Sequence, residues 1–168
     1  IGVLTYDMGP EGYPGDLNRS SVTIAEVLKG IGYRTYLSGK WHLSKSLTEP
    51  SDSWPLQRGF DEFFGTIIGA GSFYYPSTLT RGNENAEHEA VDNEDFYYTD
   101  AISDQAVKYI QDHVKNYPDR PFFQYVAYTA PHWPLQAPEE DIAKYKGKFD
   151  KGWDRLREER LDRMIHPA

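Results

Sequence analysis

A helix, a glycine turn and a short strand follow one another without interruption over residues 23–39. Thr23 and Glu26 have the spacing of a capping box, which predicts that a helix begins there. The predicted apolar face of this helix consists of Ile24, Val27, Leu28 and Ile31. Residues 33–38 then alternate as a strand does. A helix that turns directly into a strand predicts an α/β fold, with the polar residues after the strand lying at its carboxyl end.

A second strand is predicted over residues 122–128, which are almost all aromatic or aliphatic and are expected to be buried. Apolar residues at helical spacing predict a helix over residues 100–114. Parallel strands need such a crossover, so we expect residues 33–38 and 122–128 to be parallel strands of one sheet, with this helix on one face. Two more helices are expected, one from residue 138 and one from residue 153. Residues 60–65 fit either a strand or a turn, and residues 74–95 show no clear period.

Composition excludes several classes of protein. Eighteen basic residues against 26 acidic ones give a net charge of −8, which argues against general nucleic-acid binding. No apolar run is long enough to predict a membrane span. Without cysteine the chain has no disulfide, thiolate metal site or cysteine nucleophile. Residues 82–107 carry eight acids and no lysine or arginine, and are expected to form a solvated loop, with a cation site as the alternative.

Lys40 and His42 follow the first predicted strand, and His132 follows the second. Ligands of open α/β sheets bind at the carboxyl edge, so these three side chains are candidates for a common site. A lysine suits an anionic group, and a histidine exchanges a proton near neutral pH. The alternative is that all three lie on unrelated surfaces as ordinary loop residues. His113, on the stripe of the helix over residues 100–114, is expected to be packed rather than functional.

Two stretches of the chain resemble the sulfatase family. Residues 32–43, GYRTYLSGKWHL, resemble the second sulfatase signature, which ends in Gly-Lys-Trp-His. Residues 121–135, PFFQYVAYTAPHWPL, look like a strand and loop of the same enzymes. Residues 58–65 and 137–145 are also similar to family members, and the resemblance runs through nearly the whole chain in the right order.

The resemblance implies an alkaline-phosphatase-like α/β fold, with a mixed or mostly parallel sheet and helices on both faces. Residues 1–168 would be part of a single sulfatase catalytic domain, acting on a small sulfate ester or a sulfated carbohydrate, in the periplasm or outside the cell. In that family a formylglycine hydrate attacks sulfur beside a bound calcium ion. The positions of Lys40, His42 and His132 match a lysine that holds sulfate, a histidine that takes the hydroxyl proton and a histidine that contacts sulfate and can protonate the leaving alcohol.

The chain departs from the family pattern in two respects. The nucleophile motif Cys/Ser-x-Pro-Ser-Arg does not occur in it, nor do the aspartate and Asp-Asn motifs that bind calcium. We therefore expect an internal section of a sulfatase that is inactive alone and holds no complete calcium site. The alternatives are a phosphodiesterase or phosphonate hydrolase of the same superfamily, or a non-catalytic fragment that binds anions.

Overall fold

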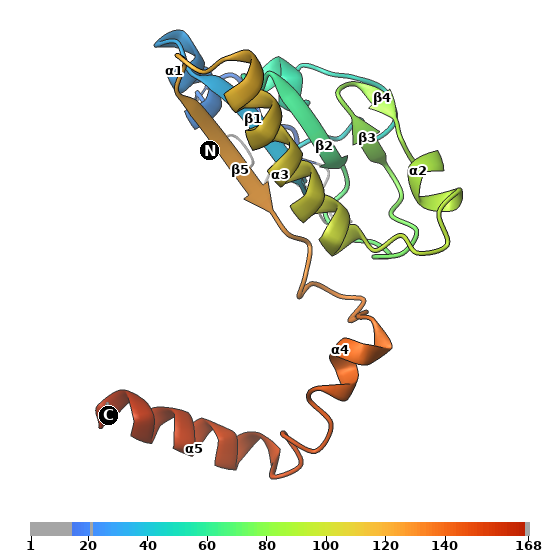
Figure 1. The fold of residues 1–168 in the computed structure, drawn as a ribbon, viewed down its shortest axis with the longest axis vertical. Coiled ribbons are helices and arrows are strands. Elements are labelled where there is room, and N and C mark those ends of the chain that lie inside the picture. The colour runs from blue at the N-terminus through green and yellow to red at the C-terminus, as the bar shows by residue number, and fades with distance from the viewer. Residues whose placement is uncertain (1–14, 21, 167–168) are drawn as a thin grey trace. The chain divides into compact units, whose positions relative to one another are not determined.

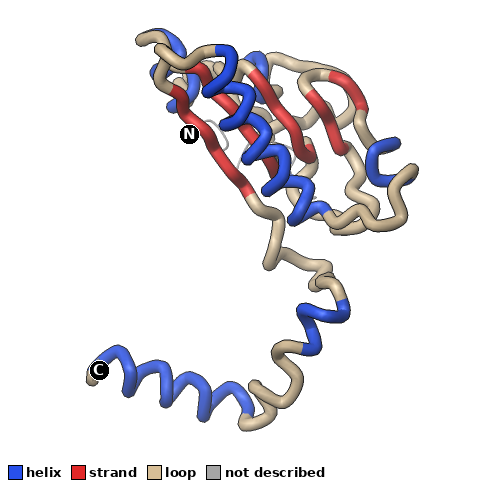
Figure 2. The backbone as a smooth tube through the Cα atoms, viewed as in Figure 1, coloured by secondary structure: helices blue, strands red, loops and turns tan. Residues whose placement is uncertain are grey.

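A computed structural model describes residues 15–20 and 22–166 of the chain, which separate into two compact units at Leu135 and Gln136. The first unit contains a five-stranded sheet in the order β4-β3-β2-β1-β5 (Figure 1). Its strands are β1 (Arg34–Gly39), β2 (Glu62–Thr66), β3 (Leu79–Arg81), β4 (Glu84–Asn85) and β5 (Phe122–Ala127). Its helices, coloured blue in Figure 2, are α1 (Ile24–Gly30), the short 3-10 helix η2 (Pro55–Arg58), α2 (His88–Val91) and α3 (Tyr98–Asn116).

The centre of the sheet is parallel. Strand β1 pairs in parallel with β2 on one side and with β5 on the other, and Gly39 lies opposite Ala127. The predicted parallel relation of the two strands is therefore confirmed. Strands β3 and β4 are antiparallel additions beyond β2, so the sheet is mixed, as the family resemblance implied.

Helices cover both faces of this sheet. Neighbouring residues of a strand point to opposite faces, and β1 shows this clearly. Tyr36 packs in one cluster with α3, where its ring stacks on that of Tyr109 at 5.2 Å. Leu37 belongs to a second cluster on the other face, which includes Ala25 of α1. Figure 1 shows α3 running along the sheet near β1 and β5.

Helix α1 begins as predicted but presents an unexpected face to the core. Thr23 accepts a hydrogen bond from the Glu26 amide, and the Glu26 carboxylate accepts one from the Thr23 amide, which completes the capping box. The predicted apolar face is largely exposed, whereas Ala25 is buried. The reason is the close approach of Gly59, where an added Cβ would lie 2.4 Å from the Glu26 nitrogen. The side of α1 that meets this backbone must therefore be small.

The prediction that residues 122–128 are buried was wrong. Strand β5 has a neighbour on only one side within the sheet of described residues. Its position at the edge leaves Tyr125, Val126 and the following Tyr128 substantially exposed. An apolar run therefore identified the strand but not its place in the sheet.

The acidic segment over residues 82–107 is more ordered than expected. It contains β4, α2 and the first half of α3 instead of a continuous loop. The Glu89 carboxylate pairs with the Arg81 guanidinium at 2.8 Å, and the Glu87 carboxylate accepts a hydrogen bond from the Thr78 amide. Part of the negative charge is therefore used in structural contacts.

The second unit contains two helices, α4 (Glu139–Ala143) and α5 (Gly152–Ile165), close to where the sequence predicts them. Neither helix has a buried residue. Within the part of the chain that the structure describes, no helix combines the length and apolar character needed to cross a membrane.

Candidate functional site

The loop over residues 40–42 is held at the carboxyl edge of the sheet by three backbone hydrogen bonds. The Lys40 amide donates to the Ala127 carbonyl at 2.8 Å, at the end of β5. The amides of Trp41 and His42 donate to the carbonyls of Thr66 and Ile67, at the end of β2, at 2.9 and 3.0 Å. The loop therefore lies between the carboxyl ends of two strands, which is where the sequence predicts a binding site.

Two glycines allow the strand ends to approach this closely. A Cβ on Gly39, which has a φ of 119°, would lie 2.0 Å from the Ala127 oxygen. A Cβ on Gly65 would lie 1.8 Å from the Gly39 oxygen. His42 itself has a φ of 64°, which is uncommon for a residue other than glycine. The backbone at this edge is thus fixed in an unusual conformation, a feature that often accompanies function.

Trp41 anchors the loop in the core between the two candidate side chains. It is buried, and its indole nitrogen donates to the Ser53 carbonyl at 2.8 Å. Its ring meets that of Phe60 edge to face at 6.1 Å. Trp41 therefore packs its loop against the core, whereas Trp133, beside His132, is 73% exposed.

The charges of the site act on His42. Burial lowers its pKa, and the positive charges of Lys40 and His132 lower it further. Burial also lowers the pKa of Lys40. Burial and the charges of Lys40 and His132 thus all favour the neutral form of His42. We predict that the tips of these three side chains lie within roughly 10 Å of one another, because groups that handle one reacting centre must be held near it.

His132 lies in an exposed loop after β5 and has a defined orientation. Its Nδ1 atom is 2.7 Å from the Trp133 carbonyl oxygen. Because a carbonyl only accepts, Nδ1 donates this hydrogen bond, which leaves Nε2 available to another partner. The His132 amide donates to the carbonyl of buried Thr129 at 2.8 Å, which ties this loop to the chain just after β5.

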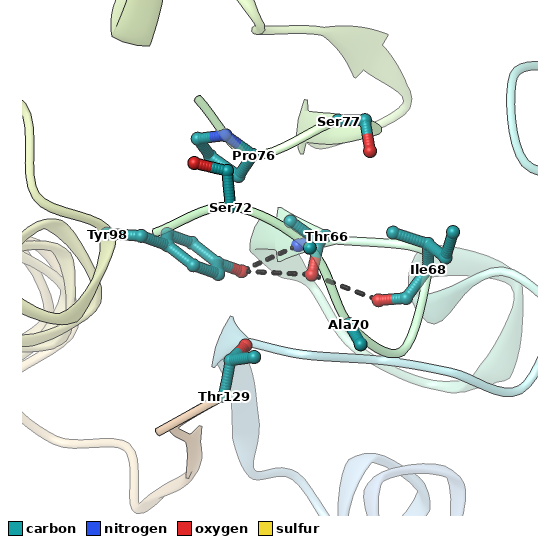
Figure 3. A pocket seen from close by; sticks show the side chains of 9 residues that line it. Thr66, Ile68, Ala70, Ser72, Pro76, Ser77, Tyr98 and Thr129 are labelled. Atoms are coloured by element: carbon teal, nitrogen blue, oxygen red, sulfur yellow. Dashed lines mark hydrogen bonds between the residues drawn. The ribbon is translucent and has the colours of Figure 1, made fainter. Parts of the chain in front are cut away.

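A cavity of about 10 Å³ lies beside the same edge (Figure 3). The Tyr98 hydroxyl accepts a hydrogen bond from the Thr66 amide at 2.8 Å and donates to the Thr66 hydroxyl at 3.3 Å. The Thr129 hydroxyl lines this cavity and has no hydrogen-bond partner among the described residues. A cavity of this size holds about one water molecule, so it is too small for a substrate. The candidate site is the open edge itself.

Gly69, which lies against the imidazole ring of His42, was not predicted from the sequence as a site residue. The available signal was the position of the glycine-rich run over residues 69–72 directly after residues 60–65, because the end of any parallel neighbour of β1 reaches the same edge. Because residues 60–65 also fit a turn, the sequence alone did not place the following glycine-rich run at this edge.

The residues that the structure describes do not form the calcium site that the family resemblance implies. Within residues 15–20 and 22–166, no three histidine, aspartate or glutamate side chains gather where they could hold a metal ion. Asp16, the acid beside the loop, accepts hydrogen bonds from the Lys45 amide at 2.7 Å and the Ser53 hydroxyl at 2.9 Å.

Residues 3–166 match the family model described as Sulfatase. The chain belongs to the sulfatase family. It is 34% identical to an uncharacterized sulfatase of Schizosaccharomyces pombe, over 91% of this chain and 28% of that protein. It is 32% identical to an arylsulfatase of Klebsiella aerogenes, over 97% of this chain and 36% of that protein. The chain thus spans about a third of the length of these curated relatives.

Solved structures of sulfatases have a similar fold. The crystal structure of Ps i-CgsB matches with a TM-score of 0.69 and 28% identity, covering 89% of this chain and 35% of that one. The PsFucS1 sulfatase from Pseudoalteromonas matches with a TM-score of 0.53 and 20% identity, over 81% of this chain and 33% of that one. The α/β architecture expected from the resemblance is therefore confirmed, and the sulfatase chain has its signature residues at the carboxyl edge of the sheet.

Proposed function

We propose that this sulfatase chain provides the sulfate-contacting edge of a sulfuric ester hydrolase, with Lys40, His42 and His132 as the contacting side chains. The observation that carries the proposal is the loop over residues 40–42, held between the ends of β2 and β5. The charges of Lys40 and His132 both act on the imidazole of His42, which supports a common site.

The three side chains have complementary chemistry in this proposal. Hydrolysis of a sulfate ester breaks a bond between sulfur and oxygen, and negative charge develops on the departing oxygen in addition to the charge that the sulfate group already carries. The Lys40 ammonium stabilises the charge on the sulfate oxygens. Neutral His42 accepts a proton from a hydroxyl group, and His132 in its protonated form donates one to the departing alkoxide.

The nucleophile has no candidate in this sequence, because the Cys/Ser-x-Pro-Ser-Arg motif is absent. We therefore propose that residues 1–168 are part of a single sulfatase catalytic domain and that they bind sulfate without turning over esters. The same absence favours the second candidate function, a fragment that binds anions without catalysis.

Two relatives indicate the class of substrate. Ps i-CgsB, 27% identical over 84% of this chain, has been crystallised with k-i-k-neocarrahexaose. The relative from Klebsiella aerogenes is named an arylsulfatase. We propose that the ester is carried by a carbohydrate or a small aryl compound, and that the part of it recognised by this chain is the sulfate group.

Calorimetric titration of the purified chain with sodium sulfate tests the proposal. We expect saturable binding that the substitution Lys40→Gln weakens about tenfold, because one charge-assisted contact with sulfate is lost. Lys45→Gln is the matched control, since Lys45 lies in the same stretch of chain and is exposed. Equal binding by the Lys40→Gln variant and the unsubstituted chain would overturn the assignment of Lys40.

A further inference from the structure

We propose that Gly69 is a positioning residue for His42, because the missing side chain at Gly69 leaves the space in which the imidazole ring lies. The inference rests on the proposed function, because that function requires the His42 ring to be held in one place. It adds a residue that the family signature does not include.

The geometry of the contact is close. A Cβ on Gly69 would lie 2.2 Å from Cε1 and Nδ1 of His42 and 2.3 Å from Cγ. These separations are far below van der Waals contact, so the ring and an alanine at position 69 cannot both occupy their places. Gly69 has no left-handed φ, in contrast to Gly39 and Gly65. The position therefore needs glycine for space and not for backbone conformation.

The backbone on the Gly69 side of the contact is firmly held. The Ile67 and Ile68 amides donate to the carbonyl and hydroxyl of Thr78, at 3.3 and 3.0 Å. The Thr66 hydroxyl donates to the Ile68 carbonyl at 3.1 Å, as the dashed line in Figure 3 shows. Three hydrogen bonds thus fix the chain immediately before Gly69.

The backbone of His42 is held to the same segment, because its amide donates to the Ile67 carbonyl. The two backbones therefore cannot move apart without breaking these hydrogen bonds, whereas the side chain of His42 can change its rotamer. A methyl group at position 69 should push the imidazole ring out of its place while the fold survives.

The displacement has a measurable consequence for the charge of the ring. In its present place the imidazole is partly buried, and the positive charges that act on it come from Lys40 and His132. A ring displaced toward solvent regains hydration. Hydration favours the imidazolium form, so the pKa of His42 rises.

The test compares Gly69→Ala with Gly71→Ala in the full 168-residue chain. Gly71 lies two residues further along the same loop and also has no left-handed φ. A Cβ there would meet nothing closer than the Ser77 hydroxyl oxygen, at 3.8 Å. The readout is the pKa of His42 from an NMR titration of the histidine ring resonances, assigned with a His42→Gln variant. We expect the pKa to rise toward the ordinary value of ~6.5 in Gly69→Ala and to stay unchanged in Gly71→Ala.

A second measurement on the unsubstituted chain keeps the inference testable even if Gly69→Ala does not fold. The Gly69 Hα protons should show nuclear Overhauser contacts to the His42 ring protons. A folded Gly69→Ala variant with an unchanged His42 pKa, or the absence of these contacts, would overturn the inference. Neither measurement uses sulfate or an ester, so failure of the proposed function leaves both results interpretable.

Discussion

Side chains on the loop over residues 40–42 alternate between the edge of the sheet and its core. Lys40 and His42 are partly exposed, whereas Trp41 between them is buried and donates a hydrogen bond to the Ser53 carbonyl. A spacing of two residues thus places both polar groups on one side of a buried anchor. This arrangement makes the two side chains neighbours in space as well as in sequence, so the charge of one acts on the other.

The first prediction concerns that charge. Lys40→Gln should raise the pKa of His42, because removal of a nearby positive charge favours the protonated ring. Lys45→Gln should leave it unchanged, and NMR titration of the histidine ring measures both. The same pKa in all three chains would show that the Lys40 ammonium lies too far from His42 to share a ligand with it.

A second prediction concerns His113 of α3, which is buried as the sequence predicts. Its Nε2 atom lies 2.8 Å from the Arg120 carbonyl and must donate to it, so Nδ1 accepts from the Tyr36 hydroxyl at 2.9 Å. In His113→Leu the buried Tyr36 hydroxyl loses its partner, and we expect a destabilisation of about 1–3 kcal/mol in urea unfolding.

The double variant Tyr36→Phe/His113→Leu provides the control for this pair, since it removes both polar partners. It should be less destabilised than the sum of the two single variants. Strict additivity would contradict a hydrogen bond between these side chains.

At the scale of elements, local signals predicted most of the structure. The capping box at Thr23 locates the start of α1, and helical spacing locates α3 within two residues at each end. Strands β3 and β4 were not predicted, because two or three residues are too few to show a period. The buried face of α1 was also missed, since it depends on the approach of Gly59 from another part of the chain.

For the candidate site, the sequence predicted Lys40, His42 and His132. It did not predict Gly69, because the role of Gly69 depends on a contact across the sheet edge.

The capping box yields a prediction at this scale. The Thr23 hydroxyl accepts from the Glu26 amide and donates to the Arg58 carbonyl at 2.8 Å. Thr23→Ala removes both contacts and should cost about 1–2 kcal/mol of unfolding free energy, measured with urea. Thr48→Ala, at an exposed loop threonine, is the control. Equal losses in the two variants would show that the cap does not stabilise α1.

At the scale of the whole molecule, the described residues leave several apolar surfaces uncovered. Tyr125 and Val126 on β5, and Val107 and Val114 on α3, are all substantially exposed. The second unit likewise has no buried residue in its two helices. Exposed strand edges and apolar patches of this kind promote association.

The chain in isolation is therefore predicted to self-associate through the β5 edge. Sedimentation velocity should show an average mass that rises with concentration, and Tyr125→Lys should reduce this rise by placing a charge on the edge. Tyr75→Lys, at a tyrosine that is 66% exposed in a loop, should leave it unchanged. Equal association of the Tyr125→Lys and Tyr75→Lys variants would show that the contact does not involve the β5 edge.

In the proposed function, His42 and His132 contact the same sulfate group although they are 90 positions apart in the sequence. The most direct test is a sulfate titration of the unsubstituted chain, followed by NMR of the histidine rings at constant pH. We predict that the resonances of His42 and His132 shift along one saturable curve with a common dissociation constant, while those of buried His113 stay in place. Saturation of only one of the two rings, or different dissociation constants for them, would contradict a common site.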